Sequence, residues 1–131
     1  MARVRTRDTS PERTVRTLLH KMGFRFQLHL KSLPGSPDIV LPKYSTVIFV
    51  HGCFWHRHAR CKRTTTPKTR TPFWIAKFEA NIARDRSARR KLVSLGWSVV
   101  TVWECQTANP ERLAKVLRGK LNLRADSTLP R

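Results

Sequence analysis

VIFVHGCFWHRHARC, residues 47–61, joins a strand pattern directly to a loop of unusual composition and decides how the chain around it is arranged. Its first four residues are continuously apolar, which is typical of a strand buried on both faces of a sheet. The residues that follow include three histidines, two cysteines and an adjacent Phe-Trp pair, none of which a buried strand requires. We therefore interpret the stretch as a buried strand followed by a loop that serves a purpose other than packing.

On the N-terminal side of this stretch, the apolar spacing predicts one helix and two further strands. Helical spacing covers residues 10–22 and is followed by Gly23, a favourable helix terminator. Residues 24–30, FRFQLHL, alternate apolar and polar side chains with the period of a half-buried strand. The short run DIVL, residues 38–41, predicts a second strand, and the strand of the central stretch begins at Thr46.

On the C-terminal side, the pattern continues as helix, strand and helix. Pro72 opens a long helix that Gly96 ends, and WSVVTVW at residues 97–103 predicts a fourth strand. A last helix begins at Pro110 and runs to about Leu117. The order helix, three strands, helix, strand, helix predicts an α/β fold with a central mixed sheet flanked by helices.

Chain length predicts the number of domains, and hydropathy predicts the cellular compartment. A chain of 131 residues fits a single domain with one core, and we expect residues 1–8 and 122–131 to be flexible. No stretch approaches the ~20 apolar residues of a membrane span, and the first ten residues lack the apolar centre of a signal peptide. We therefore expect a cytoplasmic protein with no membrane partner.

The charge indicates the partner. Lys and Arg number 27 against 8 Asp and Glu, so the formal net charge is +19. Such an excess repels itself in a compact state unless a polyanion is present, and nucleic acid is the expected polyanion. A ribosomal-type or membrane-surface basic protein is the alternative, because basicity supplies affinity rather than chemistry.

Cysteine and histidine spacing predicts a metal centre in the loop after the central strand. Cys53, His58 and Cys61 lie within nine residues, and chain reversal after the fourth strand could bring Cys105 to the same sheet end. Three cysteines and one histidine suit tetrahedral Zn(II). A closed shell of four protein ligands would hold the aperiodic segment 51–71 and perform no hydrolysis. Free buried cysteines beside a surface histidine are the alternative interpretation.

Asp38 is the candidate for a hard metal ligand, because it heads an otherwise apolar strand. One interpretation is an Asp that satisfies the turn after Pro37. The other is an oxygen ligand for Mg(II), the cation that pairs with phosphate substrates. Antiparallel pairing with the central strand would place Asp38 beside Val50, His51 and His56.

His51 and His56 flank the Gly-Cys-Phe-Trp stretch and are not needed in the zinc set. A histidine with a pKa near neutrality can take a proton from an attacking water or give one to a departing oxygen. Glu12, early in the first helix, is one of the few acids available to orient such a histidine, although helix capping explains it equally well.

Phe54 and Trp55 are adjacent in a loop otherwise rich in cations, and Trp74 begins the second helix. Large apolar side chains beside Arg and Lys suit wedging between base pairs. Core packing under the loop is the alternative. Trp97 and Trp103 are expected to pack against the sheet.

With these residues assembled, the chain resembles the very short patch repair (Vsr) endonuclease family, mismatch-specific DNA-nicking enzymes with a PD-(D/E)xK-type nuclease fold. The resemblance covers roughly residues 6–105. The motifs that carry it are TRDTSPE, LPGSPDIVL, VIFVHGCFWH, PKTRTPFW, NIARD, LGW and VWEC.

The resemblance implies a role for each matching position. Asp38 and the backbone carbonyl of Val50, where the family commonly has Thr, would bind Mg(II). His51 and His56 would be the catalytic histidines, with Glu12 an acid near them. The remaining implied residues are the Zn(II) ligands Cys53, His58, Cys61 and Cys105, the wedge residues Phe54, Trp55 and Trp74, and the mismatch contacts Lys77 and Asn81. Arg84 and Asp85 fall in a shared motif without an assigned role.

The function that follows is a Mg(II)-dependent endonuclease that nicks one strand at a T:G mismatch produced by deamination of 5-methylcytosine. Its partner would be double-stranded DNA carrying that mismatch. We expect a monomer, associated with the bacterial nucleoid and linked in function to a cytosine-5 methyltransferase and mismatch-repair proteins. The alternatives are a restriction or defence endonuclease of the same fold that needs no mismatch, and a non-catalytic, zinc-stabilised DNA-binding module.

Overall fold

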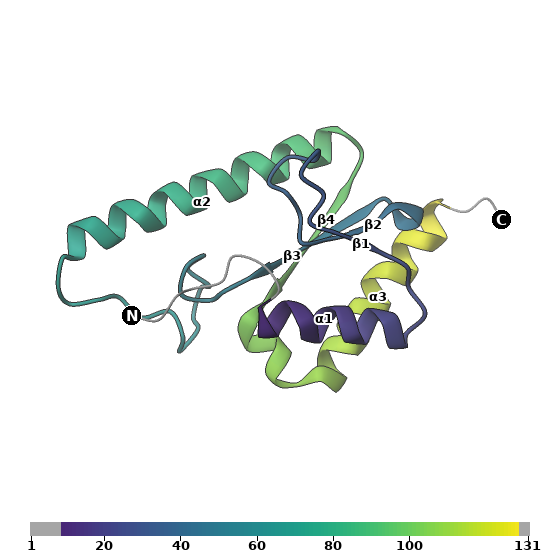
Figure 1. The fold of residues 1–131 in the computed structure, drawn as a ribbon, viewed down its shortest axis with the longest axis horizontal. Coiled ribbons are helices and arrows are strands. Elements are labelled where there is room, and N and C mark those ends of the chain that lie inside the picture. Colours follow the sequence, from purple (N-terminus) through teal and green to yellow (C-terminus); the bar gives the residue numbers. More distant parts are fainter. Residues whose placement is uncertain (1–8, 129–131) are drawn as a thin grey trace.

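The computed structural model describes residues 9–128, in which a four-stranded mixed sheet lies between one long helix and two further helices (Figure 1). The elements follow in the order α1 (Ser10–Lys21), β1 (Gln27–Leu28), β2 (Ile39–Leu41), η1 (Pro42–Tyr44), β3 (Thr46–His51), α2 (Thr71–Ser94), β4 (Ser98–Trp103), η2 (Glu104–Ala108) and α3 (Pro110–Thr128). This order confirms the predicted succession and adds the two short 3-10 turns η1 and η2. None of the described helices is long and apolar enough to cross a membrane.

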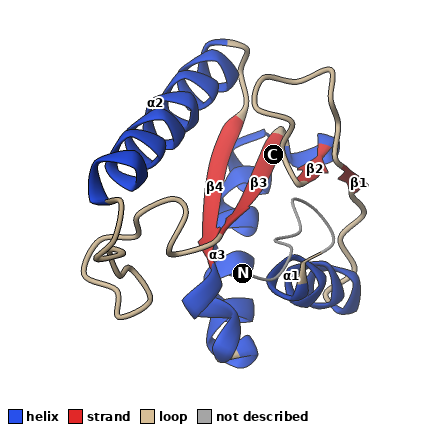
Figure 2. Cartoon of the chain, turned by 60° about the vertical axis from the view of Figure 1, so that its left-hand side comes forward, coloured by secondary structure: helices blue, strands red, loops and turns tan. Residues whose placement is uncertain are grey.

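The sheet topology brings two chemically specialised segments together. The strand order is β1-β2-β3-β4; β2 pairs antiparallel with both β1 and β3, and β3 pairs parallel with β4. The parallel pair requires a long crossover, which α2 provides. Because β3 and β4 run in register from Thr46–Ser98 to His51–Trp103, their C-terminal ends meet at one edge (Figure 2). The loop after β3 and the turn η2 both leave from that edge.

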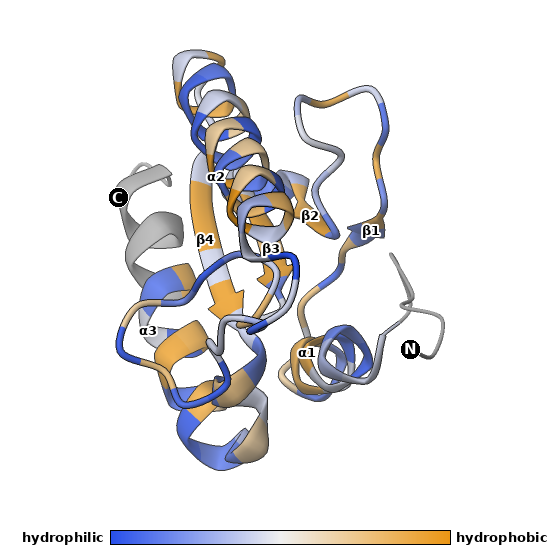
Figure 3. Cartoon of the chain, turned by 90° about the vertical axis from the view of Figure 1, so that its left-hand side faces the viewer, coloured by the Kyte–Doolittle hydropathy of each residue, from blue (hydrophilic) through white to orange (hydrophobic). Residues whose placement is uncertain are grey.

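Apolar side chains alternate between the two faces of the sheet, and each face has its own helical cover. One face packs against α1 and α3; its buried residues are Val15, Leu19, Ile39, Leu41, Ile48, Val100, Val102, Leu113, Leu117 and Leu121. The other face buries Val40 and Val47 against Leu92 of α2. Figure 3 shows the same arrangement, with the hydrophobic strands β3 and β4 between α2 and the pair α1 and α3.

Two predicted elements differ in length from the structure. The strand predicted at residues 24–30 is paired only at Gln27–Leu28, because β2 offers three residues and Phe24 and Phe26 instead pack onto the core. The last helix does not end at about Leu117 but continues to Thr128. Its continuation places Leu121 one turn after Leu117 in the same buried cluster. The expected flexibility of residues 1–8 and 129–131 concerns residues outside the described range, whereas residues 122–128, also expected to be flexible, belong to α3.

The loop before β2 is held close to α2 at Gly35. Its backbone has φ +75°, and an added Cβ would lie 2.6 Å from the Cβ of Ala88 and 3.2 Å from the Phe49 ring. Only glycine can adopt this positive φ and also lie this close to Ala88 and Phe49 at little energetic cost. The contact fixes the path of the chain immediately before Asp38.

Candidate active site and metal centre

Asp38 lies where the end of β3 meets the start of β2, as the antiparallel pairing predicts. Its Oδ2 accepts a hydrogen bond of 2.7 Å from the backbone N–H of Val50. Burial raises the pKa of Asp38 to about 6, the Val50 hydrogen bond opposes that rise, and the negative charge of Glu12 adds to it. A cation bound at this carboxylate would favour its ionised form, and the second oxygen remains able to ligate one.

Glu12 also reaches this region, although it does not orient a predicted catalytic histidine. Its side chain is almost fully buried, and its Oε2 lies 2.9 Å from Nε2 of His29 and 3.8 Å from Nη1 of Arg16. Glu12, His29 and Asp38 form a carboxylate cluster in which one ligand atom from each residue lies within 4.8 Å of the others. In the sequence, His29 is only a polar position of an alternating strand, so its contact with Glu12 was not predicted.

His51 and His56 form a stacked pair, with ring centroids 3.8 Å apart and planes inclined by 5°. Nδ1 of His56 contacts Oδ2 of Asp85 at 2.7 Å, so the acid that orients this histidine comes from α2. Burial and then the neighbouring His56 charge lower the pKa of His51 to about 4. His51 is therefore neutral near pH 7, and His56 is held with its Nε2 available for proton transfer.

Asp85 had no assigned role in the sequence motif, yet the helix pattern carried a signal. Phe78, Asn81, Asp85, Ala88 and Leu92 recur at helical spacing on α2, and three of them are buried. Asp85 is the only acid in this stripe, and the stripe faces the sheet and the loop. An acid on the buried stripe of a basic helix is the feature that identifies it.

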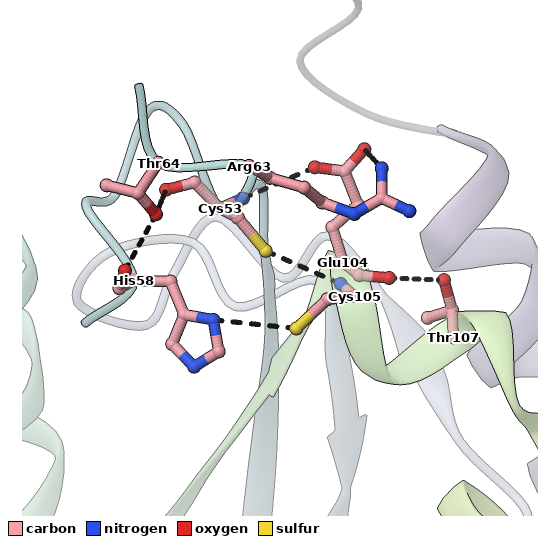
Figure 4. Close-up of polar contacts among 7 residues, drawn as sticks. All are labelled: Cys53, His58, Arg63, Thr64, Glu104, Cys105 and Thr107. Atoms are coloured by element: carbon pink, nitrogen blue, oxygen red, sulfur yellow. Dashed lines mark hydrogen bonds and ion pairs between the residues drawn. The ribbon is translucent and has the colours of Figure 1, made fainter. Parts of the chain in front are cut away.

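The four predicted soft ligands converge. One ligand atom each from Cys53, His58, Cys61 and Cys105 lies within 4.8 Å of the others, and we call this set the Cys3His cluster. Sγ of Cys105 is 3.5 Å from Nδ1 of His58 (Figure 4). In a tetrahedral zinc site this S···N edge is about 3.6 Å, given ordinary Zn–S and Zn–N bonds. The donor set and the spacing both fit a tetrahedral Zn(II) ion.

The protonation of these thiols also suits metal binding. Burial raises the pKa of Cys53 to about 12, whereas the backbone N–H of Arg63 lowers the pKa of Cys61. Without a metal, the buried Cys53 is a neutral thiol; a bound dication would release its proton. All three cysteines are free, so no disulfide competes.

Hydrogen bonds from neighbouring residues hold the Cys3His cluster in shape (Figure 4). Oε1 of Glu104 accepts from the Cys53 backbone N–H at 3.3 Å. Thr64 Oγ1 donates to the backbone oxygen of His58 at 2.7 Å and to that of Cys53 at 3.3 Å. Neither Glu104 nor Thr64 was predicted, because hydrogen bonds to the backbone leave no mark in residue spacing.

Trp103, which was expected simply to pack against the sheet, connects the two centres. Its ring stacks on His58 at 4.2 Å between centroids and meets His51 edge-on at 5.4 Å. The ring therefore touches one residue of the Cys3His cluster and one of the histidine pair.

The aromatic residues of the loop pack with the start of α2 and form an aromatic cluster of Phe54, Trp55, Phe73, Trp74 and Phe78. Phe54 lies 5.2 Å from Phe78 and 5.9 Å from Trp74, measured between ring centroids. Phe78 is buried and Phe73 is 44% exposed, so the cluster extends from the interior to solvent.

Lys77 and Asn81, the predicted mismatch contacts, both lie beside Trp55. Nζ of Lys77 is 5.8 Å from the Trp55 ring centroid, and Nδ2 of Asn81 donates to the Trp55 backbone oxygen at 3.2 Å. Arg84 in turn donates to Asn81 Oδ1. These residues therefore surround the loop aromatics from the α2 side.

Arg57, which the sequence analysis did not single out, connects the loop to the helix. Its guanidinium lies 4.0 Å from the Phe78 ring centroid and donates to the Thr65 backbone oxygen at 2.7 Å and to Thr66 Oγ1 at 2.8 Å. A cation stacked on a ring and hydrogen-bonded to two loop residues restrains the aromatic cluster.

Sequence comparison places these residues in a known context. A family described as DNA mismatch endonuclease Vsr matches residues 1–63. Type II nicking enzyme V.XorIIP of Xanthomonas oryzae pv. oryzae is 48% identical over 122 residues, which are 93% of this chain and 89% of the relative. DNA mismatch endonuclease Vsr of Escherichia coli is 45% identical over 113 residues, 86% of this chain and 72% of the relative. Type II nicking enzyme V.NmeAIP of Neisseria meningitidis is 41% identical over 122 residues, 90% of this chain and 86% of the relative.

Proposed function

Because this chain belongs to the DNA mismatch endonuclease Vsr family and is therefore a DNA endonuclease, we propose that it nicks one strand of duplex DNA at T:G mismatches. The observation that carries the proposal is that Asp38 binds the backbone N–H of Val50, the residue before His51, while His56, which stacks on His51 and contacts Asp85, lies near enough for its charge to lower the pKa of Asp38. A hard-cation ligand and a proton acceptor together are the parts that phosphodiester hydrolysis needs.

In this proposal, Asp38 and the carbonyl of Val50 would hold Mg(II), which supplies charge neutralisation at the phosphate and a more acidic water. His56 accepts the proton of the attacking water through Nε2, because its Nδ1 is engaged by Asp85. His51, kept neutral by burial, hydrogen-bonds at the reacting phosphate and supports the His56 ring by stacking. Glu12 adds negative charge beside Asp38 and strengthens the attraction for a cation.

The Cys3His cluster would bind Zn(II) as a structural ion that shapes the loop. The aromatic residues Phe54, Trp55 and Trp74 would enter the duplex, with Lys77 and Asn81 contacting the mismatched pair. A mispaired step costs less to unstack than a matched one, which gives such a wedge its selectivity. The net charge of +19 supplies the attraction to the DNA backbone.

The wider setting follows from this substrate. T:G pairs arise when 5-methylcytosine deaminates, so the proposal includes a functional link to a cytosine-5 methyltransferase and to mismatch-repair proteins. It also includes a monomeric enzyme of the PD-(D/E)xK fold that acts at the bacterial nucleoid in the cytoplasm.

The test is a panel of defined duplexes, one with each mismatch and one fully matched, incubated with zinc-loaded protein with and without Mg(II). We expect a single-strand nick only at T:G and only with Mg(II), detected as one product on a denaturing gel. Equal cleavage of matched duplexes would overturn the mismatch requirement.

A sequence-specific endonuclease without a mismatch requirement is the second candidate. The observation that favours it is that two of the relatives above are named type II nicking enzymes. Cleavage of the matched duplex at one recognition sequence distinguishes this candidate. The non-catalytic DNA-binding module is not supported, because the family consists of endonucleases.

A further inference from the structure

The carboxylate cluster contains a nitrogen donor that the proposed Mg(II) site does not need. His29 Nε2 lies 2.9 Å from Glu12 Oε2, and an Asp38 oxygen lies within 4.8 Å of both. The side chain of Glu12 is 3% exposed and that of His29 16% exposed, so these two donors are largely shielded from solvent, and Asp38 is partly buried beside them. The imidazole and the Glu12 carboxylate are partners for one another, and a cation held among the three groups would also offset the negative charge of the two acids.

The backbone aims His29 at this space from the strand opposite Asp38. The β1–β2 register pairs Leu28 with Ile39, so the next pair is His29 and Asp38, and the His29 N–H donates to the Asp38 backbone oxygen at 3.1 Å. His29 also has a left-handed backbone with φ +49°, a conformation that is sparsely populated outside glycine and concentrates at functional sites. The three donors thus come from α1, from the residue after β1 and from the residue before β2.

The spacing of these donors suits a six-coordinate ion. Adjacent ligands of an octahedral ion with bonds near 2.1 Å are about 3.0 Å apart; the 2.9 Å between Glu12 and His29 is compatible with that edge and is also the length of the direct contact that the two groups make without an ion. Imidazole nitrogen favours transition-metal ions over Mg(II), whereas carboxylates accept either. A mixed nitrogen and oxygen set therefore favours an ion such as Mn(II), which tolerates both.

We infer that His29 is a direct ligand of the metal ion at Asp38, together with Glu12, and that this site binds Mn(II)-type ions in preference to Mg(II). The inference rests on the proposed function in taking Asp38 as the catalytic metal ligand. It adds a ligand and a metal class to that site.

The experiment measures metal binding rather than nicking. Zinc-loaded protein without DNA is titrated with Mn(II) and followed by electron paramagnetic resonance, and pulsed spectra of the bound ion are recorded for hyperfine coupling to a directly coordinated nitrogen. We expect nitrogen coupling in the unmodified protein and its loss in His29→Gln. The variant should bind Mn(II) about tenfold or more weakly, with a change of less than about twofold for Mg(II).

His20→Gln is the matched control, because His20 is an exposed histidine on α1. It should keep both the nitrogen coupling and the Mn(II) affinity. If His29→Gln does not fold, anomalous scattering from Mn(II)-soaked crystals of the unmodified protein decides the question by the position of the ion relative to Nε2 of His29.

Bound Mn(II) without nitrogen coupling, or coupling that survives in folded His29→Gln, would overturn the inference. Nicking of the mismatch panel is scored separately. Nitrogen coupling without nicking would support His29 as a ligand and contradict the proposed function. Nicking without nitrogen coupling would support the proposed function and contradict His29 as a ligand.

Discussion

The Cys3His cluster and the active-site residues lie at the same edge of the sheet but are built in different ways. Three of the four soft ligands, Cys53, His58 and Cys61, come from one loop, and Cys105 joins them through β4. The acids and histidines of the candidate active site come from α1, from the ends of β1, β2 and β3, from α2 and, for His56, from the same loop. A centre made from one loop is readable from spacing, whereas a centre made from five elements depends on how they pack.

Among the substitutions considered, one at Asp38 is expected to reduce the nicking rate most. Asp38→Asn removes the anionic ligand while keeping the shape of the side chain, so nicking should fall by about a thousandfold or more. Mismatch binding should be nearly unchanged, because the aromatic cluster is untouched. Rates from single-turnover nicking and Kd values from a gel-shift assay separate the two effects. Glu111→Gln removes an exposed acid at the start of α3 and is the control, which should nick at the unmodified rate. If Asp38→Asn also nicks at the unmodified rate, Asp38 is not a metal ligand.

Cys53→Ser tests the soft-ligand centre in the same way. We expect stoichiometric zinc to be lost, together with nicking and mismatch binding, because the loop carries both His56 and the aromatic residues. The far-UV circular dichroism should change little, since the main hydrophobic core lies between the sheet, α1 and α3. Zinc content by atomic absorption is the decisive measurement, and a variant that retains one zinc per chain would disprove the assignment.

Asp85→Asn tests the contact that the sequence did not assign. The amide is a weaker partner for Nδ1 of His56 and no longer fixes the orientation of the ring, so the rate of the chemical step should fall by about a hundredfold. Binding of the mismatch should remain, which places the effect on kcat rather than on KM. Glu79→Gln, an exposed position on the same helix, is the control. An equal loss in kcat and affinity would indicate damage to the helix instead.

The smallest effect is expected at Arg57. Arg57→Met removes its stacking on Phe78 and its hydrogen bonds to the loop, so the aromatic cluster should loosen and mismatch affinity should weaken by about 1–2 kcal/mol. Tryptophan fluorescence and mismatch Kd report the change. Arg60→Met, which removes an exposed cation from the same loop, controls for the loss of charge. If both variants weaken binding equally, Arg57 contributes only its charge.

The family resemblance drawn from the motifs is confirmed by the relatives, and the order of the elements is confirmed by the fold. Element lengths were less predictable. The edge strand β1 is shorter than predicted because β2 has few residues to pair with it. The helix α3 is longer than predicted because Leu121 is buried in the core. Both outcomes depend on neighbours that residue spacing does not reveal.

The amino-acid sequence by itself determined which cysteines and histidine to expect in one cluster, the basic charge and the succession of strands and helices, because residue type and periodicity carry that information directly. Only the tertiary structure decided that Glu12 meets His29, that Asp85 supports His56, and that Trp103 bridges the two centres. Each of these pairs joins residues more than ten positions apart in the chain. Their meeting depends on which face each helix turns toward the sheet, and this is set by burial of apolar side chains rather than by the polar residues themselves.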